Sequence, residues 1–201
     1  MSPDIPWPPE VDPTAFRLDA SGLVLTPLRE EDAPELLDLA RESAPEISRW
    51  MRWTNTARDL PGAQAVLQEW IGQWNRGEGY SFAARETPSG RIMGGGGLNQ
   101  FNVKNRFGNL AYWVRTSARG RGLAPRIARS LAQFGFSHLG LVRVEILMEP
   151  ANVASVRAAE KSGALREGLL RHRILNGTEP RPAVLYSLIP TDLTAASSHP
   201  R

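Results

Sequence analysis

The feature that most constrains this chain is a glycine-containing loop between a strand-like stretch and an amphipathic stretch. The loop is Arg119-Gly-Arg-Gly-Leu-Ala124; Leu110 to Arg115 precede it, and residues 123–137 follow with apolar side chains at helical spacing. A helix start exposes unpaired N–H groups at the positive end of the helix dipole, and glycines let neighbouring N–H groups turn toward one anion. The order strand, loop, helix therefore predicts an α/β protein that binds a diphosphate at this loop.

Other glycine motifs fit the sequence less well. A dinucleotide fingerprint requires a third glycine where this chain has Pro125, and the acidic residue expected on the next strand is not evident. The run Gly94 to Gly97 lacks the Gly-Lys-Ser/Thr ending of a phosphate loop. It lies within a strand-like segment, where it predicts a bulge or a close approach of another segment. Taken alone, the Arg119–Ala124 loop could also be an ordinary surface turn.

The hydrophobic patterns outside the loop predict alternating strands and helices. Residues 1–21 form a proline-rich extended arm, residues 22–190 a single domain, and residues 191–201 a polar, disordered tail. The three strands in the middle of the chain are expected to form an antiparallel meander. The expected helices are 30–41, 63–74, 123–137 and 152–161, and the expected strands are 23–28, 80–86, 91–101, 107–115, 142–148, 165–175 and 183–189.

The composition is that of a globular protein, with 41% hydrophobic and 22% charged residues among 201. The absence of cysteine excludes disulfides, thiolate metal sites and a cysteine nucleophile, and no metal is expected. Neither an apolar run of ~20 residues nor a signal peptide is evident, so we expect a cytoplasmic protein without a membrane partner. Only Lys104 and Lys161 are lysines, which leaves 24 − 2 = 22 arginines. Because these are spread among glutamates, a nucleic-acid partner is disfavoured.

The ordered motifs resemble the GNAT superfamily of N-acetyltransferases. Arg119-x-x-Gly122-x-Ala124 is similar to the acetyl-CoA signature of that superfamily. Asn152-x-x-Ser155-x-Arg157-x-x-Glu160-Lys161-x-Gly163 resembles the second motif of the branch that contains the ribosomal-protein N-terminal (alanine/serine) acetyltransferases. The resemblance spans roughly residues 22 to 190 and includes Leu110-Ala-Tyr-Trp-Val114, Trp50-Met-Arg-Trp53 and Leu185-Tyr-Ser-Leu188. It implies the GNAT fold: a central mixed, mostly antiparallel twisted sheet of about seven strands with helices on both faces.

The resemblance also implies an activity, which is direct transfer of an acetyl group from acetyl-CoA to a primary amine in a ternary complex. The expected acceptor is a protein or peptide N-terminal α-amine, including that of a ribosomal protein. Two alternatives stay open: an acetyltransferase for a small amine such as a polyamine, an aminoglycoside or an amino acid, and a non-catalytic acyl-CoA-binding module. A homodimer is compatible with the sequence.

The resemblance implies which residues bind each part of the cofactor. The pyrophosphate is expected on the backbone of the loop, namely Arg119, Gly120, Arg121, Gly122, Leu123 and Ala124. The pantetheine arm is expected between Tyr112–Val114 and Val144–Leu147, where a backbone N–H near Trp113 or Val114 would bind the thioester oxygen. Asn152 either hydrogen-bonds this arm or caps a helix.

The catalytic residues follow less directly from the motifs. The resemblance places the hydroxyl of Ser155 close to the sulfur, which makes Ser155 the candidate general acid that protonates the thiolate; the alternative is a first-turn serine that satisfies the helix backbone. Many relatives carry a glutamate just before the Tyr-Trp pair, where this chain has Asn109, so either Glu145 or a water chain would serve as the base. Glu145 could equally form a salt bridge with Arg143 on the same strand face. Trp50, Trp53 and Tyr186 are expected either to bind the acceptor or to close the core, and Tyr112 is expected to bind the acceptor.

Overall fold

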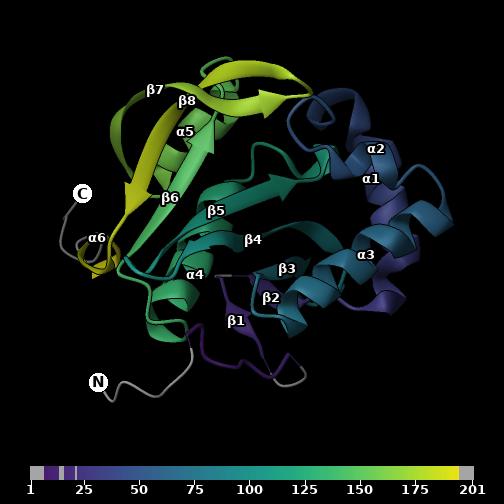
Figure 1. The fold of residues 1–201 in the computed structure, drawn as a ribbon. Helices are drawn as coiled ribbons and strands as arrows, with labels where there is room; N and C mark the ends of the chain where they lie inside the picture. The colour runs from purple at the N-terminus through teal and green to yellow at the C-terminus, as the bar shows by residue number, and fades with distance from the viewer. Residues whose placement is uncertain (1–6, 14–15, 21, 195–201) are drawn as a thin grey trace.

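The computed structural model describes residues 7–13, 16–20 and 22–194. Its centre is an eight-stranded sheet in the order β1-β2-β3-β4-β5-β6-β8-β7, antiparallel except for the pair β5–β6 (Figure 1). One strand more is present than the resemblance implied. The strands are β1 (Leu18–Asp19), β2 (Leu23–Pro27), β3 (Gly79–Glu86), β4 (Ile92–Asn102), β5 (Phe107–Val114), β6 (Arg143–Met148), β7 (Leu165–Asn176) and β8 (Glu179–Leu188).

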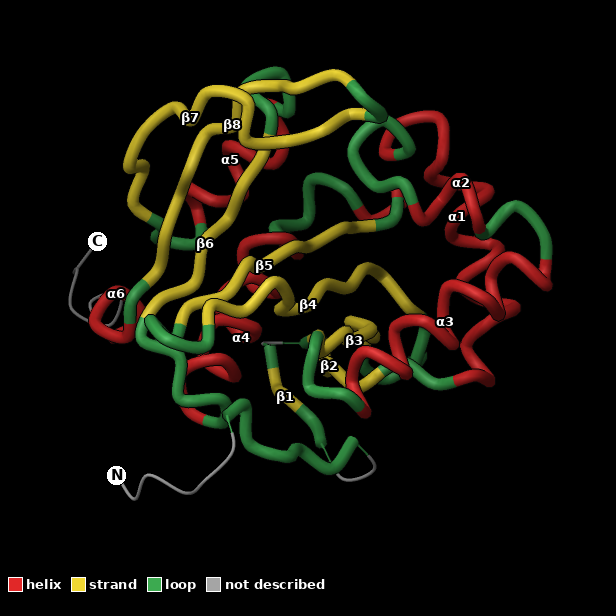
Figure 2. Tube along the Cα trace, viewed as in Figure 1, coloured by secondary structure: helices red, strands yellow, loops and turns green. Residues whose placement is uncertain are grey.

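Helices cover both faces of the sheet, as predicted (Figure 2). On one face α1 to α3 enclose a core with Ala83, Ile92 and Trp113. On the other face α4 and α5 enclose a larger core that includes Tyr80 and Phe82. The helices are α1 (Ala33–Ile47), α2 (Trp53–Thr56), α3 (Leu60–Asn75), α4 (Leu123–Ser137), α5 (Val153–Lys161) and α6 (Pro190–Thr194), with 3₁₀ turns at Glu30–Asp32 and Thr116–Ala118.

The strands β3, β4 and β5 form the predicted meander, and the glycine run of β4 lies at its centre. A Cβ atom on Gly95 would lie 2.5 Å from Cζ2 of Trp113, and a Cβ on Gly96 would lie 2.8 Å from Cδ1 of Leu131. A side chain at either position would therefore displace a packed neighbour. The expected close approach thus occurs on both faces of this strand, with Trp113 on one and α4 on the other.

The parallel pair β5–β6 separates toward its C-terminal ends. Pairing runs from Phe107↔Arg143 to Asn109↔Glu145 and then stops, although β5 continues to Val114 and β6 to Met148. Figure 1 shows the two arrows diverging from a common origin. This separation opens a space at the centre of the sheet where backbone groups of both strands lack a neighbouring strand.

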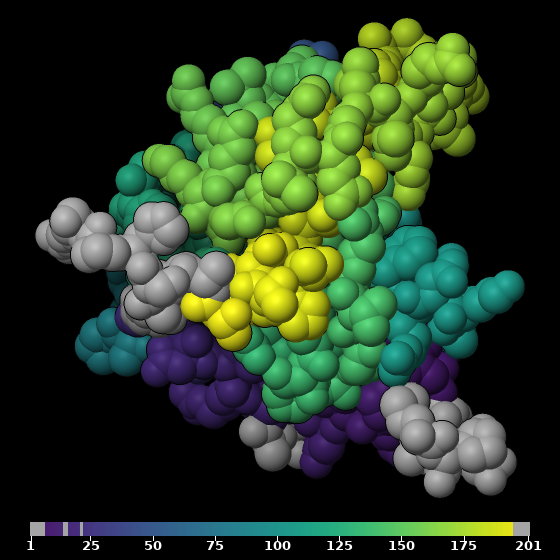
Figure 3. Space-filling model, turned by 90° about the vertical axis from the view of Figure 1, so that its left-hand side faces the viewer, coloured from purple at the N-terminus to yellow at the C-terminus, as the bar shows by residue number. Residues whose placement is uncertain are grey.

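The predicted arm contributes to the core. Trp7 donates a hydrogen bond from Nε1 to the carbonyl of Leu139 at 2.6 Å, and the Phe16 ring lies 5.0 Å from the Phe134 ring. Two residues of the arm, Leu18–Asp19, form β1, which is too short to show a strand pattern in the sequence. At the other end α6 occupies the first residues of the predicted tail and lies at the surface (Figure 3), and residues 195–201 lie outside the described residues.

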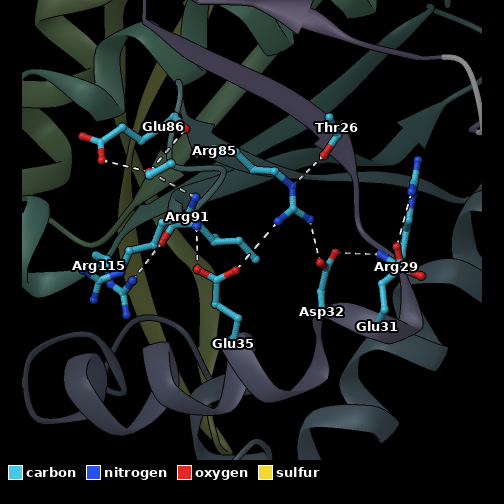
Figure 4. A network of polar contacts seen from close by, with 11 residues as sticks. Thr26, Arg29, Glu31, Asp32, Glu35, Arg85, Glu86, Arg91 and Arg115 are labelled. Carbon is cyan, nitrogen blue, oxygen red and sulfur yellow. Dashed lines mark hydrogen bonds and ion pairs between the residues drawn. The ribbon is translucent and has the colours of Figure 1, made fainter.

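Helix α1 is fixed to the sheet at its N-terminal end by a polar network (Figure 4). Arg85 of β3 donates hydrogen bonds to Oγ1 of Thr26 at 3.0 Å and to Oδ1 of Asp32 at 2.6 Å. Glu35 accepts a 2.7 Å hydrogen bond from the backbone N–H of Ile92. These hydrogen bonds are partly buried and join the sheet to the start of α1. They therefore fix the direction in which α1 runs toward the centre of the molecule.

Candidate active site

A cavity of ≈ 620 Å³ lies between the separated strands and the ends of α1, α4 and α5. The Arg119–Ala124 loop and the motif that begins at Asn152 both contribute to it, because the turn after β5 leads into α4 and the turn after β6 leads into α5. Its described lining is mostly apolar and contains no carboxylate. The lining residues are Ile47, Trp50, Met51, Tyr112, Trp113, Val114, Ala118, Arg119, Gly120, Gly122, Leu123, Ala124, Pro125, Ala151, Asn152, Val153, Ala154, Ser155, Arg157, Ala158 and Lys161.

The loop at the start of α4 presents its backbone to this cavity. Gly120 and Gly122 adopt φ angles of 76° and 69°, and a Cβ atom on either would meet nothing within 4 Å. The left-handed conformation, rather than crowding within the protein, therefore requires glycine here. Leu123 and Ala124 are the first residues of α4, so their N–H groups have no acceptor inside the helix. The loop and helix start can together bind a diphosphate.

The C-terminal half of α1 holds this loop in place. Glu42 accepts hydrogen bonds from Nε of Arg115 at 3.1 Å and from the backbone N–H of Ser117 at 2.7 Å, and Glu46 forms a 2.5 Å ion pair with Arg119. Burial acts to raise the pKa of Glu42, but the hydrogen bonds from Ser117 and the charge of Arg115 outweigh it and hold that pKa below its usual value. Glu42 is therefore ionised where it anchors the loop.

The cationic side chains at the cavity differ from those expected. Arg121 forms a 2.6 Å ion pair with Glu86 and is absent from the lining, so only its backbone remains a candidate for the cofactor. Arg157 and Lys161 of α5 line the cavity instead, exposed and without a carboxylate partner among the described residues. They lie one helical turn apart, and this i, i+4 spacing was the available sequence signal.

The backbone N–H of Val114 faces the gap between β5 and β6. Arg115 donates its N–H to Met93 of β4 at 3.0 Å, and in an antiparallel pair successive residues alternate between facing their partner and facing away. The N–H of Trp113 therefore faces β4, whereas the N–H groups of Tyr112 and Val114 face the side that β6 has left. Of the two candidates for binding the thioester oxygen, this geometry favours Val114.

Ser155 and Tyr112 meet across the cavity. The Ser155 hydroxyl donates to the Tyr112 hydroxyl at 3.2 Å, and the Tyr112 hydroxyl donates to the Ser155 carbonyl at 2.8 Å. Burial raises the pKa of Tyr112 to about 12, so the phenol stays protonated and orients Ser155. Asn152 caps α5 by accepting the Ser155 N–H at 3.2 Å through Oδ1, while it also lines the cavity.

A second, smaller cavity of ≈ 130 Å³ adjoins the first at Ser155 and Tyr112. It runs between the link from α1 to α2 and the end of β7, which lie next to each other in Figure 1. It shares five lining residues with the larger cavity, which are Trp50, Met51, Tyr112, Asn152 and Ser155. Its remaining lining residues are Arg49, Arg52, Leu110, Ala111, Ile146, Leu147, Met148, Glu149, Ile174, Leu175 and Asn176.

The structure places Glu145 in a salt-bridge network and Glu149 at the cavity. Glu145 pairs with Arg143 at 3.0 Å, and Arg143 also donates two 2.6 Å hydrogen bonds to Glu167. Those hydrogen bonds, with one from Ser187, lower the pKa of Glu167 to about 2. Glu145 lines neither cavity, whereas Glu149, which the sequence motifs did not single out, is the one carboxylate in the described lining of either.

Two of the aromatic residues proposed for the acceptor lie in the cores. The Trp53 ring packs 5.6 Å from the Trp70 ring and 5.3 Å from the Trp113 ring, because α2 begins at Trp53 and turns it toward α3. Tyr186 is 1% exposed and donates its hydroxyl to Glu160 at 3.0 Å. Neither lines a cavity, so these two placements favour the core alternative; Trp50 and Tyr112 line both cavities.

A parallel strand pair that separates beside a glycine loop and a helix start agrees with the acyl-CoA-dependent acetyltransferase site that the sequence motifs imply. The model of the acetyltransferase (GNAT) domain family matches residues 22–165, and the chain therefore belongs to that family. It is 29% identical over 154 residues to the uncharacterized N-acetyltransferase p20 of Bacillus licheniformis, covering 74% of this chain and 82% of p20.

Solved structures agree with this assignment. A putative ribosomal-protein-serine acetyltransferase from Vibrio cholerae is 28% identical, with a TM-score of 0.80 over 90% of this chain and 100% of that one. RimJ of Mycobacterium smegmatis, solved with a CoA-disulfide, shares the fold with 20% identity and a TM-score of 0.77, over 90% of this chain and 92% of RimJ. The protein is accordingly an N-acetyltransferase that uses acetyl-CoA.

Two further findings concern the described part of the chain. It contains no group of three or more His, Asp or Glu residues arranged to hold a metal ion. No helix within it has the length and apolar character needed to cross a bilayer. The cytoplasmic location stays a prediction, and so does the homodimer.

Proposed function

We propose that this enzyme acetylates the N-terminal α-amine of a protein or peptide by direct attack on the thioester of bound acetyl-CoA. The observation that carries the proposal is the meeting of two cavities at Ser155 and Tyr112, which allows the thioester and the amine to approach from opposite sides. The smaller cavity is lined toward its mouth by exposed residues, including Arg52 and Leu175. An acceptor peptide can therefore extend to solvent while its α-amine lies inside the cavity. This arrangement favours a peptide over a small amine.

Each step has a candidate group in the site. The loop backbone from Arg119 to Ala124 holds the diphosphate, and Arg157 and Lys161 add positive charge along the same cavity. The Val114 N–H donates to the thioester oxygen as it gains negative charge. Ser155 donates a proton to the departing sulfur and regains one from solvent water. No covalent bond to the protein is needed in this scheme.

Glu149 is the candidate that receives the proton of the acceptor ammonium. It follows the last residue of β6, is half-buried, and its carboxylate has no hydrogen bond or ion pair within the described part of the chain. A carboxylate in this position can bind the cationic amine and then remove its proton directly or through one water. Glu145 lacks this freedom because Arg143 already occupies it.

Replacing Ser155 with alanine should lower kcat about tenfold, because the leaving sulfur then takes its proton from water. The melting temperature should change little, since the capping bond to Asn152 uses the backbone N–H of residue 155, which alanine retains. Initial rates of thiol release and a thermal melt of each protein would measure both quantities. An unchanged kcat would remove Ser155 from the mechanism and leave the cofactor site unaffected.

The proposal is tested by following CoA release with a panel of acceptors. Peptides beginning with Ala, Ser and Met should be acetylated at their α-amines, as mass spectrometry of the products would show. The same peptides with a blocked N-terminus should be inert. Turnover of a polyamine, an aminoglycoside or a free amino acid in place of every peptide would overturn the peptide assignment. Binding of acetyl-CoA without turnover of any amine would instead indicate a non-catalytic acyl-CoA-binding module.

A further inference from the structure

The charges that line the smaller cavity indicate which peptides it accepts. We infer that the acceptor carries an acidic side chain within its first few residues, recognised by Arg49 and Arg52; this inference rests on the proposed function. Both arginines belong to the link between α1 and α2, are exposed, and line the cavity. Glu149 is the one opposing charge in the described lining, and its backbone carbonyl accepts the Asn152 N–H at 2.9 Å.

These two arginines carry charge that the described residues leave unneutralised. Neither has a carboxylate partner among those residues. Several arginines of the neighbouring elements, by contrast, form ion pairs. These pairs are Arg85 with Asp32, Arg115 with Glu42, Arg119 with Glu46, Arg121 with Glu86, and Arg143 with Glu145 and Glu167.

The local structure holds one of the charges in a defined place. The guanidinium carbon of Arg49 lies 4.6 Å from the centre of the Trp50 ring, and Trp50 itself lines both cavities. Stacking on this ring limits the conformations of Arg49 without using its hydrogen-bond donors. A planar guanidinium can then bind a carboxylate with two hydrogen bonds. Across the cavity the end of β7 contributes the uncharged residues Ile174, Leu175 and Asn176.

The opposite charges in the smaller cavity fix the direction in which the acceptor peptide binds. Its ammonium is attracted to the half-buried Glu149, while a carboxylate on a following residue is attracted to the exposed Arg49 and Arg52. A basic side chain in the same place would meet two unpaired cations, which disfavours binding. Arg49 and Arg52 should contribute to binding of the peptide more than to the chemical step. Substitutions of these arginines should therefore alter KM rather than kcat.

The test compares three peptides that share an N-terminal serine and differ at positions 2 to 4, which are acidic, neutral or basic. With the native enzyme kcat/KM should fall in that order, about tenfold from acidic to neutral, and the difference should shrink at high salt. Arg52→Glu should lose the preference for the acidic peptide and raise kcat/KM for the basic one. Arg58→Glu is the matched control, because Arg58 is also exposed, lies outside both linings, and changes the net charge equally.

The outcomes separate the inference from the function on which it rests. Equal kcat/KM for all three peptides would overturn the acidic preference while leaving N-terminal acetylation standing. The same loss of preference in Arg58→Glu would show a general effect of net charge and would also overturn it. No acetylation of any peptide, with turnover of a small amine, would instead remove the proposed function.

Discussion

Gly122→Val is expected to raise the Kd for CoA about a hundredfold. Gly122 has a φ of 69° at the start of α4, a conformation that costs a β-branched residue about 1–3 kcal/mol. The chain would relieve that cost by changing the loop, and the N–H groups of Leu123 and Ala124 would then no longer converge on the diphosphate. Loss of one hydrogen bond to a charged group is worth about 1.5–3 kcal/mol, which corresponds to roughly ten- to hundredfold in affinity. Calorimetric titration with CoA would measure the change.

A matched variant separates the site from simple backbone strain. Gly140 has a φ of 65°, a Cβ atom there would meet nothing within 4 Å, and it lies beyond the far end of α4. Gly140→Val should lower the melting temperature of the free protein as Gly122→Val does, because the backbone strain is similar. Its Kd for CoA should stay at the native value. Equal losses of affinity in both variants, or none in Gly122→Val, would mean that the diphosphate binds elsewhere.

The sequence contained enough information to predict the frame that carries the loop. The helix over residues 123–137 was predicted with its observed bounds, because its apolar residues recur at helical spacing and a proline lies in its first turn. The meander was also correct, since three short apolar stretches are separated by turn residues. Such patterns depend only on local periodicity, which a single sequence displays directly.

Features that depend on tertiary contacts were not predictable in the same way. Helix α1 was expected to end at Arg41, but it continues to Ile47 through Pro45. A proline inside a helix removes one backbone hydrogen bond and costs ~3 kcal/mol or more. The contacts that Glu42 and Glu46 make with the loop after β5 stabilise this continuation. The same extension brings Trp50 to the cavities.

The same distinction between local patterns and tertiary contacts applies to the site residues. The backbone of the loop was identified from its glycines and the helix after it, and Ser155 and Asn152 from the resemblance to the acetyltransferase motifs; the structure brings all three to one cavity. The orientation of two side chains could not be predicted from the sequence. Arg121 forms an ion pair with Glu86 from a distant strand, and Trp53 is oriented by the short helix α2. Glu149 had no sequence signal beyond its position one residue after a strand, which is where parallel strands place functional side chains.

Glu149→Gln is expected to lower kcat/KM for a peptide acceptor about a hundredfold at neutral pH. Glutamine keeps the size and the hydrogen-bonding shape of the side chain but can neither attract the ammonium nor remove its proton. General base catalysis contributes on the order of 10²–10⁴ in rate, so the lower end of that range is a conservative expectation. Glu145→Gln provides the comparison on the same strand, and it should retain most activity because Glu145 faces Arg143 outside the cavities.

The pH dependence distinguishes a lost base from a damaged fold. Without Glu149 the reaction must use the fraction of acceptor that is already unprotonated, and a peptide α-amine titrates near ~7.7–8.0. The rate of Glu149→Gln should therefore rise roughly five- to eightfold between about pH 7.0 and 8.5 and recover part of the loss, whereas the native rate should depend on pH less. A variant that lost activity through misfolding would not recover in this way. If Glu145→Gln showed the larger loss and the recovery at high pH, the base would be Glu145, and the role given to the smaller cavity would fail with Glu149.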